Sequence, residues 1–365
     1  MGRGIQWFGV LLASMLFLMT VPHVLSIPYW VKPGVYVKYA ALRYEPYVQY
    51  KESLGVKKPP MTMILFYNRS GVLFNIHATG DVFLTFGIER DNGTHLEVAF
   101  RLTAYNVTVD VVQKNSTKLP VFWNESQIVS SNISKTKWPG LVEYKIHMKS
   151  LKIAGSYSIR KNDGMVIGPN GKHYGHTFLW YDPNENFGSN TPYVNLTPVA
   201  SPLYLNGTIG LDKKLVTHYG TFGPPIGRVV LVQKNPSPIK VCFSVGTHKE
   251  CPFGTGDNEI IGGITYDPAS GITIAGDLLI PPADVRAIGI VYALFSDLKG
   301  AYFNEVKADY SMYPVLQIYD TNAEFQKAQE VPFSKAKTPW KYVFYIALTV
   351  LGIMAGTRSG GLPKW

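Results

Sequence analysis

Apolar and polar residues alternate along most of the central part of the chain, which is the pattern of half-buried β-strands. The runs in which this alternation is clearest are residues 62–66, 72–78, 82–88 and 96–104. Further short runs, separated by Gly, Pro, Asn and Asp turns, are residues 228–233, 240–245, 259–266, 271–279 and 288–295. The last run has a short helix as its alternative, because two prolines precede it. A first strand is expected from Val35, after the Pro33–Gly34 turn. The pattern predicts a mainly β fold with one or two antiparallel β-sandwich domains.

The alternation changes phase at Tyr105 and Asn106. Apolar residues occupy even positions from 96 to 104 and odd positions from 107 to 111. Because successive side chains of a strand point to opposite faces, this shift requires a bulge or a bend. We therefore expect the strand to bend at these two residues.

A basic strand is expected around residue 146. The side chains predicted to be buried are Tyr144, Ile146 and Met148, and those predicted to face solvent are Lys145, His147 and Lys149. Residues 134–161 together carry a local net charge of +6. This charge is either a patch for an anionic surface or a charged strand face that prevents edge pairing, and the second interpretation is the simpler one.

Turn-forming residues suggest a division of the body into two β domains, residues 27–161 and 162–320. The boundary is the hairpin turn at residues 162–164, and a second turn is expected at residues 169–171. Residues 51–60 are interpreted as a basic linker, residues 113–140 as a long glycosylated loop, and residues 182–225 as mostly loop. Residues 321–339 are expected to form a juxtamembrane helix and linker. The helix, residues 322–331, would be capped by Thr321 and Glu324.

An apolar run near the end of the chain, residues 340–358, predicts a transmembrane helix. Crossing the hydrocarbon core takes about 20 helical residues, so Lys341 and Arg358 would extend toward the interfaces. The alternative, a buried core helix, is disfavoured because the run is apolar on every face. Residues 359–365 would then be a short cytoplasmic tail.

The beginning of the chain resembles a signal peptide. Arg3 provides the positive start, residues 5–21 the apolar stretch, and a small-residue cleavage site precedes Ile27. Residues 1–26 are therefore expected to be a signal peptide, with an uncleaved signal anchor as the alternative. Either interpretation places the body outside the cell, at the cell membrane.

Eight Asn-X-Ser/Thr sequons support export, because composition alone would give about two. Their asparagines are Asn68, Asn92, Asn106, Asn115, Asn124, Asn132, Asn195 and Asn206. All eight lie between the two apolar runs. We therefore expect N-glycans on the body.

Two cysteines in an exported chain suggest one disulfide, Cys242–Cys251. Gly246 suits the first position of a two-residue type II′ loop. With Gly246–Thr247 as the loop, Val245 faces His248 and the two cysteines face each other. Their Cα atoms would then approach to about 4.5 Å, at the short end of the range for a disulfide. Two free thiols are the alternative.

The net charge of +10 permits an anionic partner, such as lipid headgroups, an acidic glycan or nucleic acid. Export and the lack of an Arg-rich tract argue against nucleic acid. No cofactor is expected, because the sequence has neither a P-loop nor a dinucleotide fingerprint.

Candidate catalytic and metal-binding residues are few. His173 and His176, with Asp182, are the best candidate metal ligands, although two histidines three apart on a strand would point to opposite faces. The carboxylates of Asp257, Glu259 and Asp267 are candidates for a hydrolytic pair, and no nucleophile motif is present.

The segments WVKPGVYVKY, residues 30–39, and TYDPASGITI, residues 265–274, resemble uncharacterised, membrane-anchored surface proteins of hyperthermophilic archaea. The resemblance implies a β-rich ectodomain and no known activity. The short tail after the apolar run is also similar to archaeal C-terminal sorting signals, but their Pro-Gly-Phe is missing here.

Three functions remain open at this point. The first is a membrane-anchored extracellular glycoprotein that acts as a structural or interaction module at the cell surface. The second is a carbohydrate- or lipid-binding ectodomain, or an accessory subunit of a membrane complex. The third, a surface hydrolase, has the least support from the sequence.

Overall fold

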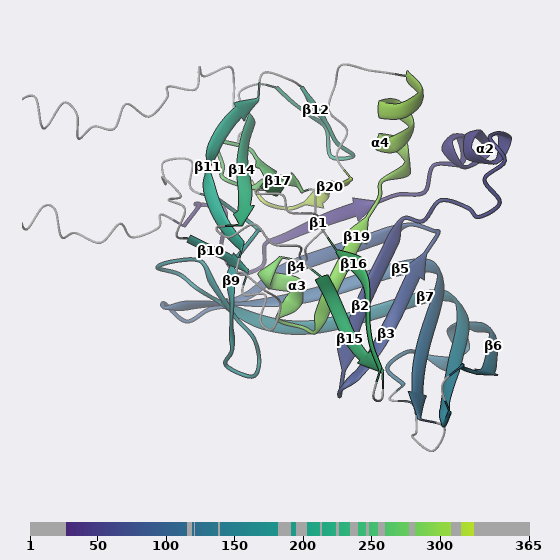
Figure 1. Ribbon diagram of the computed structural model, residues 1–365. Helices are drawn as coiled ribbons and strands as arrows, with labels where there is room; N and C mark the ends of the chain where they lie inside the picture. The colour runs from purple at the N-terminus through teal and green to yellow at the C-terminus, as the bar shows by residue number, and fades with distance from the viewer. Residues whose placement is uncertain are drawn as a thin grey trace, which may run out of the picture.

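The computed structural model describes residues 27–324, except for residues 115–118, 120, 138, 182–190, 195–202, 212–213, 224–225, 234–239, 246–247, 255–259, 277–281 and 308–314. The predicted fold class is confirmed as mainly β, since 16 strands of this part of the chain form one large antiparallel sheet (Figure 1). In the first half of the chain the strands are β1 (Tyr36–Ala41), β2 (Met63–Arg69), β3 (Val72–Ala78), β4 (Val82–Asp91), β5 (His95–Lys114), β6 (Ile128–Lys135), β7 (Leu141–Arg160), β8 (Met165–Ile167) and β9 (His173–His176).

The second half adds shorter strands and small helices. The strands are β10 (Thr191–Val194), β11 (Leu203–Leu211), β12 (Leu215–Val216), β13 (Thr221–Phe222), β14 (Ile226–Gln233), β15 (Lys240–Val245), β16 (His248–Gly254), β17 (Ile260–Tyr266), β18 (Thr273–Gly276), β19 (Ile290–Phe295) and β20 (Leu316–Thr321). The helices are α2 (Glu45–Ser53), α3 (Ala283–Arg286) and α4 (Leu298–Tyr302), with the short turns η1 (Glu125–Gln127) and η2 (Phe303–Lys307).

Two strands of 20 residues each, β5 and β7, form the centre of the large sheet. They pair along their whole length, from His95 opposite Arg160 to Lys114 opposite Leu141. The other edge of β5 is shared between two partners: residues 96–104 pair with β4 and residues 107–110 pair with β3. The sheet therefore has two parts. We call β1, β4, residues 95–105 of β5 and residues 150–160 of β7 the first half-sheet, and β2, β3, β6, β19 and the rest of β5 and β7 the second half-sheet.

The bend predicted at Tyr105 and Asn106 is confirmed, and it joins the two half-sheets. Both residues are exposed, and Asn106 has a left-handed backbone with φ of 51°. β7 changes phase at the same level, because Met148 and Leu151 are both buried. Tyr105 is paired with Ser150, so the two strands bend together. Such shared bends are how a strand continues from one sheet layer into the next.

The tight turn between β3 and β4 packs against this bend. Gly80 N donates a hydrogen bond of 3.1 Å to Tyr105 O, and Tyr105 N donates one of 3.0 Å to Asp81 O. A Cβ on Gly80 would lie 2.7 Å from Tyr105 O, so only glycine allows this approach. The turn thereby fixes the point at which β5 exchanges β4 for β3 as its partner.

The first half-sheet continues through β20, β18, β17, β14 and β11 to β10, which contacts β9. Figure 1 shows these strands curving over β1 and β4. The enclosed core is rich in aromatic residues: the Phe86 ring lies 5.1 Å from the ring of Phe100 and 5.2 Å from that of Phe178, between centroids. Each such pair adds about 0.5–1.5 kcal/mol beyond area burial. Strands from both sides of residues 162–164 thus contribute to one sheet and one core.

Three regions differ from the sequence-based expectations. Helix α2 overlaps the predicted linker of residues 51–60; its sequence signals are Pro46 in the first turn, with Glu45 beside it, and Lys51 in the last turn. Strand β6 and η1 lie within the predicted loop of residues 113–140, because the edge of β7 offers this polar segment a pairing partner. Four short strands, β10 to β13, lie within the predicted loop of residues 182–225.

Within the described residues, none of the helices is both long enough and apolar enough to cross a membrane. The expected spans at residues 1–26 and 340–358 lie outside the described part of the chain. Of the helix expected at residues 322–331, only residues 322–324 are described, and they are irregular. Thr321 accepts a hydrogen bond from Ala323 N instead of from Glu324.

Candidate functional site

The two histidines predicted as metal ligands lie on β9 in different environments. His173 is exposed, whereas His176 is buried and stacks on the Tyr181 ring at 5.7 Å between centroids. His176 Nδ1 lies 2.6 Å from Thr177 O, which fits a ring N–H donating to that carbonyl. Asp182 lies outside the described residues. Among the residues described, no group of three or more His, Cys, Asp or Glu could hold a metal ion, and the complete predicted set stays untested.

Of the carboxylates considered for hydrolysis, only Asp267 lies in the described part of the chain. It is buried, and its Oδ2 accepts hydrogen bonds from Ser270 N at 3.0 Å and from Ser270 Oγ at 2.6 Å. This geometry closes the tight turn between β17 and β18. The carboxylate of Asp267 therefore stabilises this turn. Asp257 and Glu259 lie outside the described residues.

A buried carboxylate that the sequence did not point to is Asp284, on α3. Its Oδ1 accepts hydrogen bonds from Tyr157 Oη at 2.8 Å and from Thr177 Oγ1 at 2.7 Å, and its Oδ2 accepts one from Phe178 N at 2.9 Å. Burial raises the pKa of Asp284 to about 6, and the three hydrogen bonds act in the opposite direction. The only sequence signal is its place just after two prolines, as an acidic residue at a helix start. The network connects α3 to β7 and to the segment after β9.

A second missed pair is His218 and Asp297. His218 Nε2 lies 2.7 Å from Asp297 Oδ2, and the Asp297 side chain is fully buried. Asp297 also accepts hydrogen bonds from Leu42 N at 2.9 Å and from Gly300 N at 2.8 Å, the latter as the N-cap of α4. The pair therefore ties the β12–β13 hairpin to α4 and to the end of β1.

The predicted alternation on β7 is confirmed. Lys145, His147 and Lys149 are exposed, Ile146 and Met148 are buried, and Tyr144 is partly buried against the core. After the bend the exposed face continues with Lys152. The basic residues of β7 thus lie on the outer face of the sheet.

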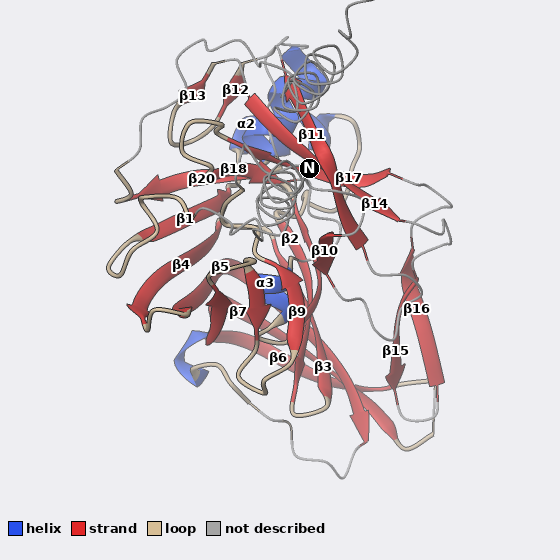
Figure 2. Cartoon of the chain, turned by 90° about the vertical axis from the view of Figure 1, so that its left-hand side faces the viewer, coloured by secondary structure: helices blue, strands red, loops and turns tan. Residues whose placement is uncertain are grey.

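The outer face of the first half-sheet carries the side chains best arranged to bind a partner. We call Lys38, Phe83, Arg101, Tyr105, Lys152 and Tyr319 the outer-face platform. Thr85 pairs with Lys38 on one side and with Arg101 on the other, and Thr103 pairs likewise with Phe83 and Lys152. Residues in register on adjacent strands point to the same face. Lys38 and Arg101 therefore lie in one row, and Phe83 and Lys152 lie in the next. The rows cross β1, β4, β5 and β7, which follow one another in Figure 2.

Aromatic rings hold one of these cations in place. Lys38 Nζ lies 4.3 Å from the centroid of the Phe83 ring and 4.8 Å from that of Tyr319. Tyr105 meets the Phe83 ring edge-on at 6.4 Å and is 46% exposed. A cation–π contact at a surface contributes about 0.5–1 kcal/mol. The ammonium of Lys38 is thus positioned by two rings.

The platform cations lie outside the ion pairs of the described residues. Among the ion pairs between described residues, none involves Lys38, Arg101 or Lys152. Asp320 is the cross-strand partner of Lys38, but its Oδ2 accepts a hydrogen bond of 2.9 Å from Tyr36 Oη. The three platform cations thus form no ion pair with a described residue, and the carboxylate of Asp320 lies beside Lys38 at the β20 edge of the platform.

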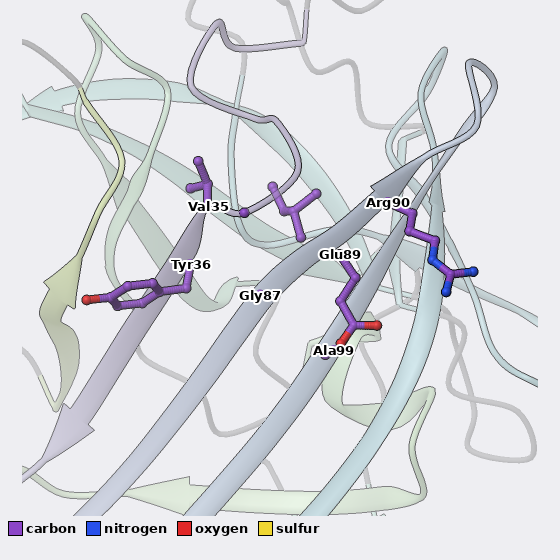
Figure 3. Close-up of a pocket in the computed structure, with 8 residues that line it drawn as sticks. Val35, Tyr36, Gly87, Glu89, Arg90 and Ala99 are labelled. Atoms are coloured by element: carbon purple, nitrogen blue, oxygen red, sulfur yellow. The ribbon is translucent and has the colours of Figure 1, made fainter.

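Beside the platform the same sheet has an open depression (Figure 3). It is lined by Tyr36 on β1, by Gly87, Glu89 and Arg90 on β4, and by Ala99 on β5. Gly87 is in register with both Tyr36 and Ala99, so two small residues lower the surface next to the tyrosine. The depression extends the surface that a partner lying across the strands would contact.

The sequon asparagines that the structure describes with their side chains are all exposed, namely Asn68, Asn92, Asn106, Asn124 and Asn132. In two of them the amide oxygen accepts a hydrogen bond from the backbone N–H two residues later: Asn92 from Thr94 at 3.1 Å and Asn124 from Ser126 at 3.0 Å. At Asn106 the amide nitrogen is engaged instead, donating to Thr79 Oγ1 at 2.6 Å. The side chains of Asn115, Asn195 and Asn206 lie outside the description.

The hairpin predicted around the cysteines is present as β15 and β16. Val245 pairs with His248, Ser244 with Lys249, and Phe243 with Glu250, as the expected loop requires. The register shifts between Val241 and Phe243, at the level of Cys242. The loop residues 246–247 and both cysteine side chains lie outside the described atoms, so the disulfide stays a prediction.

Comparison with known proteins adds no assignment: no family model matches the chain, and neither a curated protein nor a solved structure matches it. The resemblance to archaeal surface proteins therefore stays a prediction.

Proposed function

We propose that this chain is an exported glycoprotein, held in the cell membrane by its C-terminal apolar run, with a sandwich-like β body that acts as an interaction module at the cell surface. The observation that carries the proposal is the set of sequons. Eight occur between the two apolar runs, and all five described sequon asparagines are exposed. A glycan-transferring enzyme could reach each of these five side chains.

An exposed edge supports the interaction role. Strand β6 pairs with β7 and has no second partner among the described strands. Its apolar residues Val129 and Ile133 are 64% and 60% exposed. Open strand edges pair readily with other chains, and exposed apolar side chains strengthen such contacts.

The test of location is protease treatment of intact cells that carry the chain with a C-terminal tag. We expect the body to be digested from outside, while a short tagged fragment stays in the membrane fraction. Glycopeptide mass spectrometry on the same membranes should find sugar on sequon asparagines. Full protection of the body, together with unmodified sequon peptides, would contradict the proposal.

A second candidate function, a carbohydrate-binding ectodomain, is favoured by the outer-face platform. Rings beside cations and threonine hydroxyls are suited to sugar faces and their polar groups. The Tyr105 ring is exposed, and the rings of Phe83 and Tyr319 are partly exposed. The cations of this surface would also suit a lipid-binding ectodomain. The aromatic rings, which contact each other edge-on, favour the carbohydrate-binding function instead. Binding measurements distinguish the two candidates: a carbohydrate-binding ectodomain should bind glycans, and a lipid-binding ectodomain should bind vesicles.

A further inference from the structure

We propose that the outer-face platform binds an acidic polysaccharide, one that carries carboxylate or sulfate groups, laid across strands β1, β4, β5 and β7. This inference rests on the proposed surface location, since such polymers belong to cell surfaces and matrices.

The spacing of the cations is the first argument. Lys38 and Arg101 stand in one row with a single strand between them, which places their backbones roughly 10 Å apart at the usual strand spacing. Lys152 stands in the next row, on the strand beyond Arg101. Separated cations that form no ion pair with a described residue suit a polymer with anionic groups at regular intervals better than they suit a single small anion.

The aromatic and hydroxyl groups between the cations are the second argument. Phe83 and Tyr319 flank Lys38, and Tyr105 extends the aromatic surface toward the bend. Thr85 lies in register between Lys38 and Arg101, and Thr103 lies in register between Phe83 and Lys152. Rings pack on the apolar faces of sugars and hydroxyls bond to sugar hydroxyls, whereas an acidic peptide or a phosphate headgroup needs the cations alone.

The positions of the sequons are the third argument. Asn92 lies at the turn at one end of the first half-sheet, and Asn106 lies at the bend at the other end. Between them, the described strands of this half-sheet contain no sequon asparagine. On the second half-sheet, in contrast, Asn132 is paired with Lys145, so a glycan there would share the face of that lysine. The sequons of this half-sheet thus lie at its two ends, beside Tyr105 at the bend, and not among the platform cations.

The test uses the full chain, purified from membranes in detergent. Immobilised heparin and polygalacturonate are the acidic probes, dextran is the neutral one, and poly-glutamate and phosphatidylserine vesicles represent the other anions. The variant Lys38→Gln/Arg101→Gln/Lys152→Gln removes the platform cations. The matched control, Lys57→Gln/Lys172→Gln/Lys299→Gln, removes the same charge from exposed lysines elsewhere. Tyr105→Ser removes the exposed ring.

We expect binding to at least one acidic polysaccharide, weakened by salt, and none to dextran. The platform variant should lose at least about tenfold in affinity, with the control within about twofold. Tyr105→Ser should weaken polysaccharide binding but leave poly-glutamate binding unchanged. Equal losses in the platform and control variants, tighter platform-dependent binding to the vesicles, or no binding to either acidic polysaccharide would each overturn the inference. Protease shaving reports on the surface location independently of these results.

Discussion

The hydroxyl of Tyr157 donates a 2.8 Å hydrogen bond to the carboxylate of Asp284, and both side chains are buried. The contact joins the C-terminal end of β7 to α3, with 127 positions between the two residues in the sequence. His176 directly precedes Thr177 and Phe178, the other two hydrogen-bond donors to Asp284. It is buried as well, and burial lowers its pKa to about 4. Asp284, whose pKa is raised, and His176, whose pKa is lowered, thus lie buried in the same region of the core.

These two groups should give opposite pH dependences of stability. The pKa of Asp284 is about 6 in the folded state, above its ordinary 3.8, so its contribution is largest below pH 4 and is lost as pH rises toward 6. The pKa of His176 is lowered from 6.5, so its contribution is present above pH 6.5 and is lost as pH falls toward 4. Each amounts to roughly 3 kcal/mol, and in the wild type the two largely offset each other.

Asp284→Asn should therefore make the free energy of unfolding rise between pH 4 and 6.5, because only the His176 dependence is left. His176→Gln should make it fall over the same range. Urea unfolding followed by tryptophan fluorescence at pH 4, 5, 6 and 7 measures both slopes. Profiles parallel to that of the wild type in both variants would contradict this assignment.

The left-handed backbone of Asn106 predicts which substitutions the bend tolerates. Asn106→Gly should cost less than about 0.5 kcal/mol, because glycine adopts φ of 51° without strain. Asn106→Val should cost about 2 kcal/mol or more, since a β-branched residue is strained there. Thr108→Ala is the control for a substitution near the bend, because it removes only the contact of Thr108 Oγ1 with His147 Nδ1 and leaves the backbone of Asn106 unchanged. Thermal unfolding of the four proteins from a host without N-glycosylation measures the order, and equal losses for Gly and Val would show that the conformation is not required.

The sequons should differ in occupancy. At Asn92 and Asn124 the hydrogen bonds to the following residues engage the amide oxygen, so the nitrogen that receives the sugar stays accessible. At Asn106 that nitrogen donates to Thr79 Oγ1 at 2.6 Å. We expect Asn106 to carry less glycan than Asn92 or Asn124, measured by quantitative glycopeptide mass spectrometry. Thr79→Ala should raise the occupancy of Asn106, and an unchanged value would contradict the role of this hydrogen bond.

The β15–β16 hairpin joins the segments that carry Cys242 and Cys251, its register shifts at the level of Cys242, and the disulfide stays a prediction. Alkylation of the unreduced chain should leave the mass of the peptides unchanged, and alkylation after reduction should label two thiols. Closing so short a loop contributes at most about 3 kcal/mol, so Cys242→Ser should lower the free energy of unfolding by that amount or less. Two thiols labelled without reduction would exclude the bond.

Side-chain periodicity alone was sufficient to predict the strongly alternating strands and the bend at Tyr105 and Asn106, but not β6 or β10 to β13. The alternation around Ile146 and the phase change at Tyr105 are local patterns, and each has one structural solution on a pleated strand. The β15–β16 register likewise follows from the conformational demands of one short loop. Such features depend on neighbours in sequence, which is why they could be predicted.

Only the tertiary structure decided which strands are neighbours. Nothing local shows that β5 pairs with β4 before the bend and with β3 after it, or that a polar segment becomes β6 because the edge of β7 is open. The same holds for the candidate sites. Lys38 and Tyr319 are far apart in sequence, and so are Tyr157 and Asp284, yet long-range pairing and packing bring each pair together. A sequence pattern reports the face on which a side chain lies, but the contacts across that face are set by the folding of distant segments onto each other.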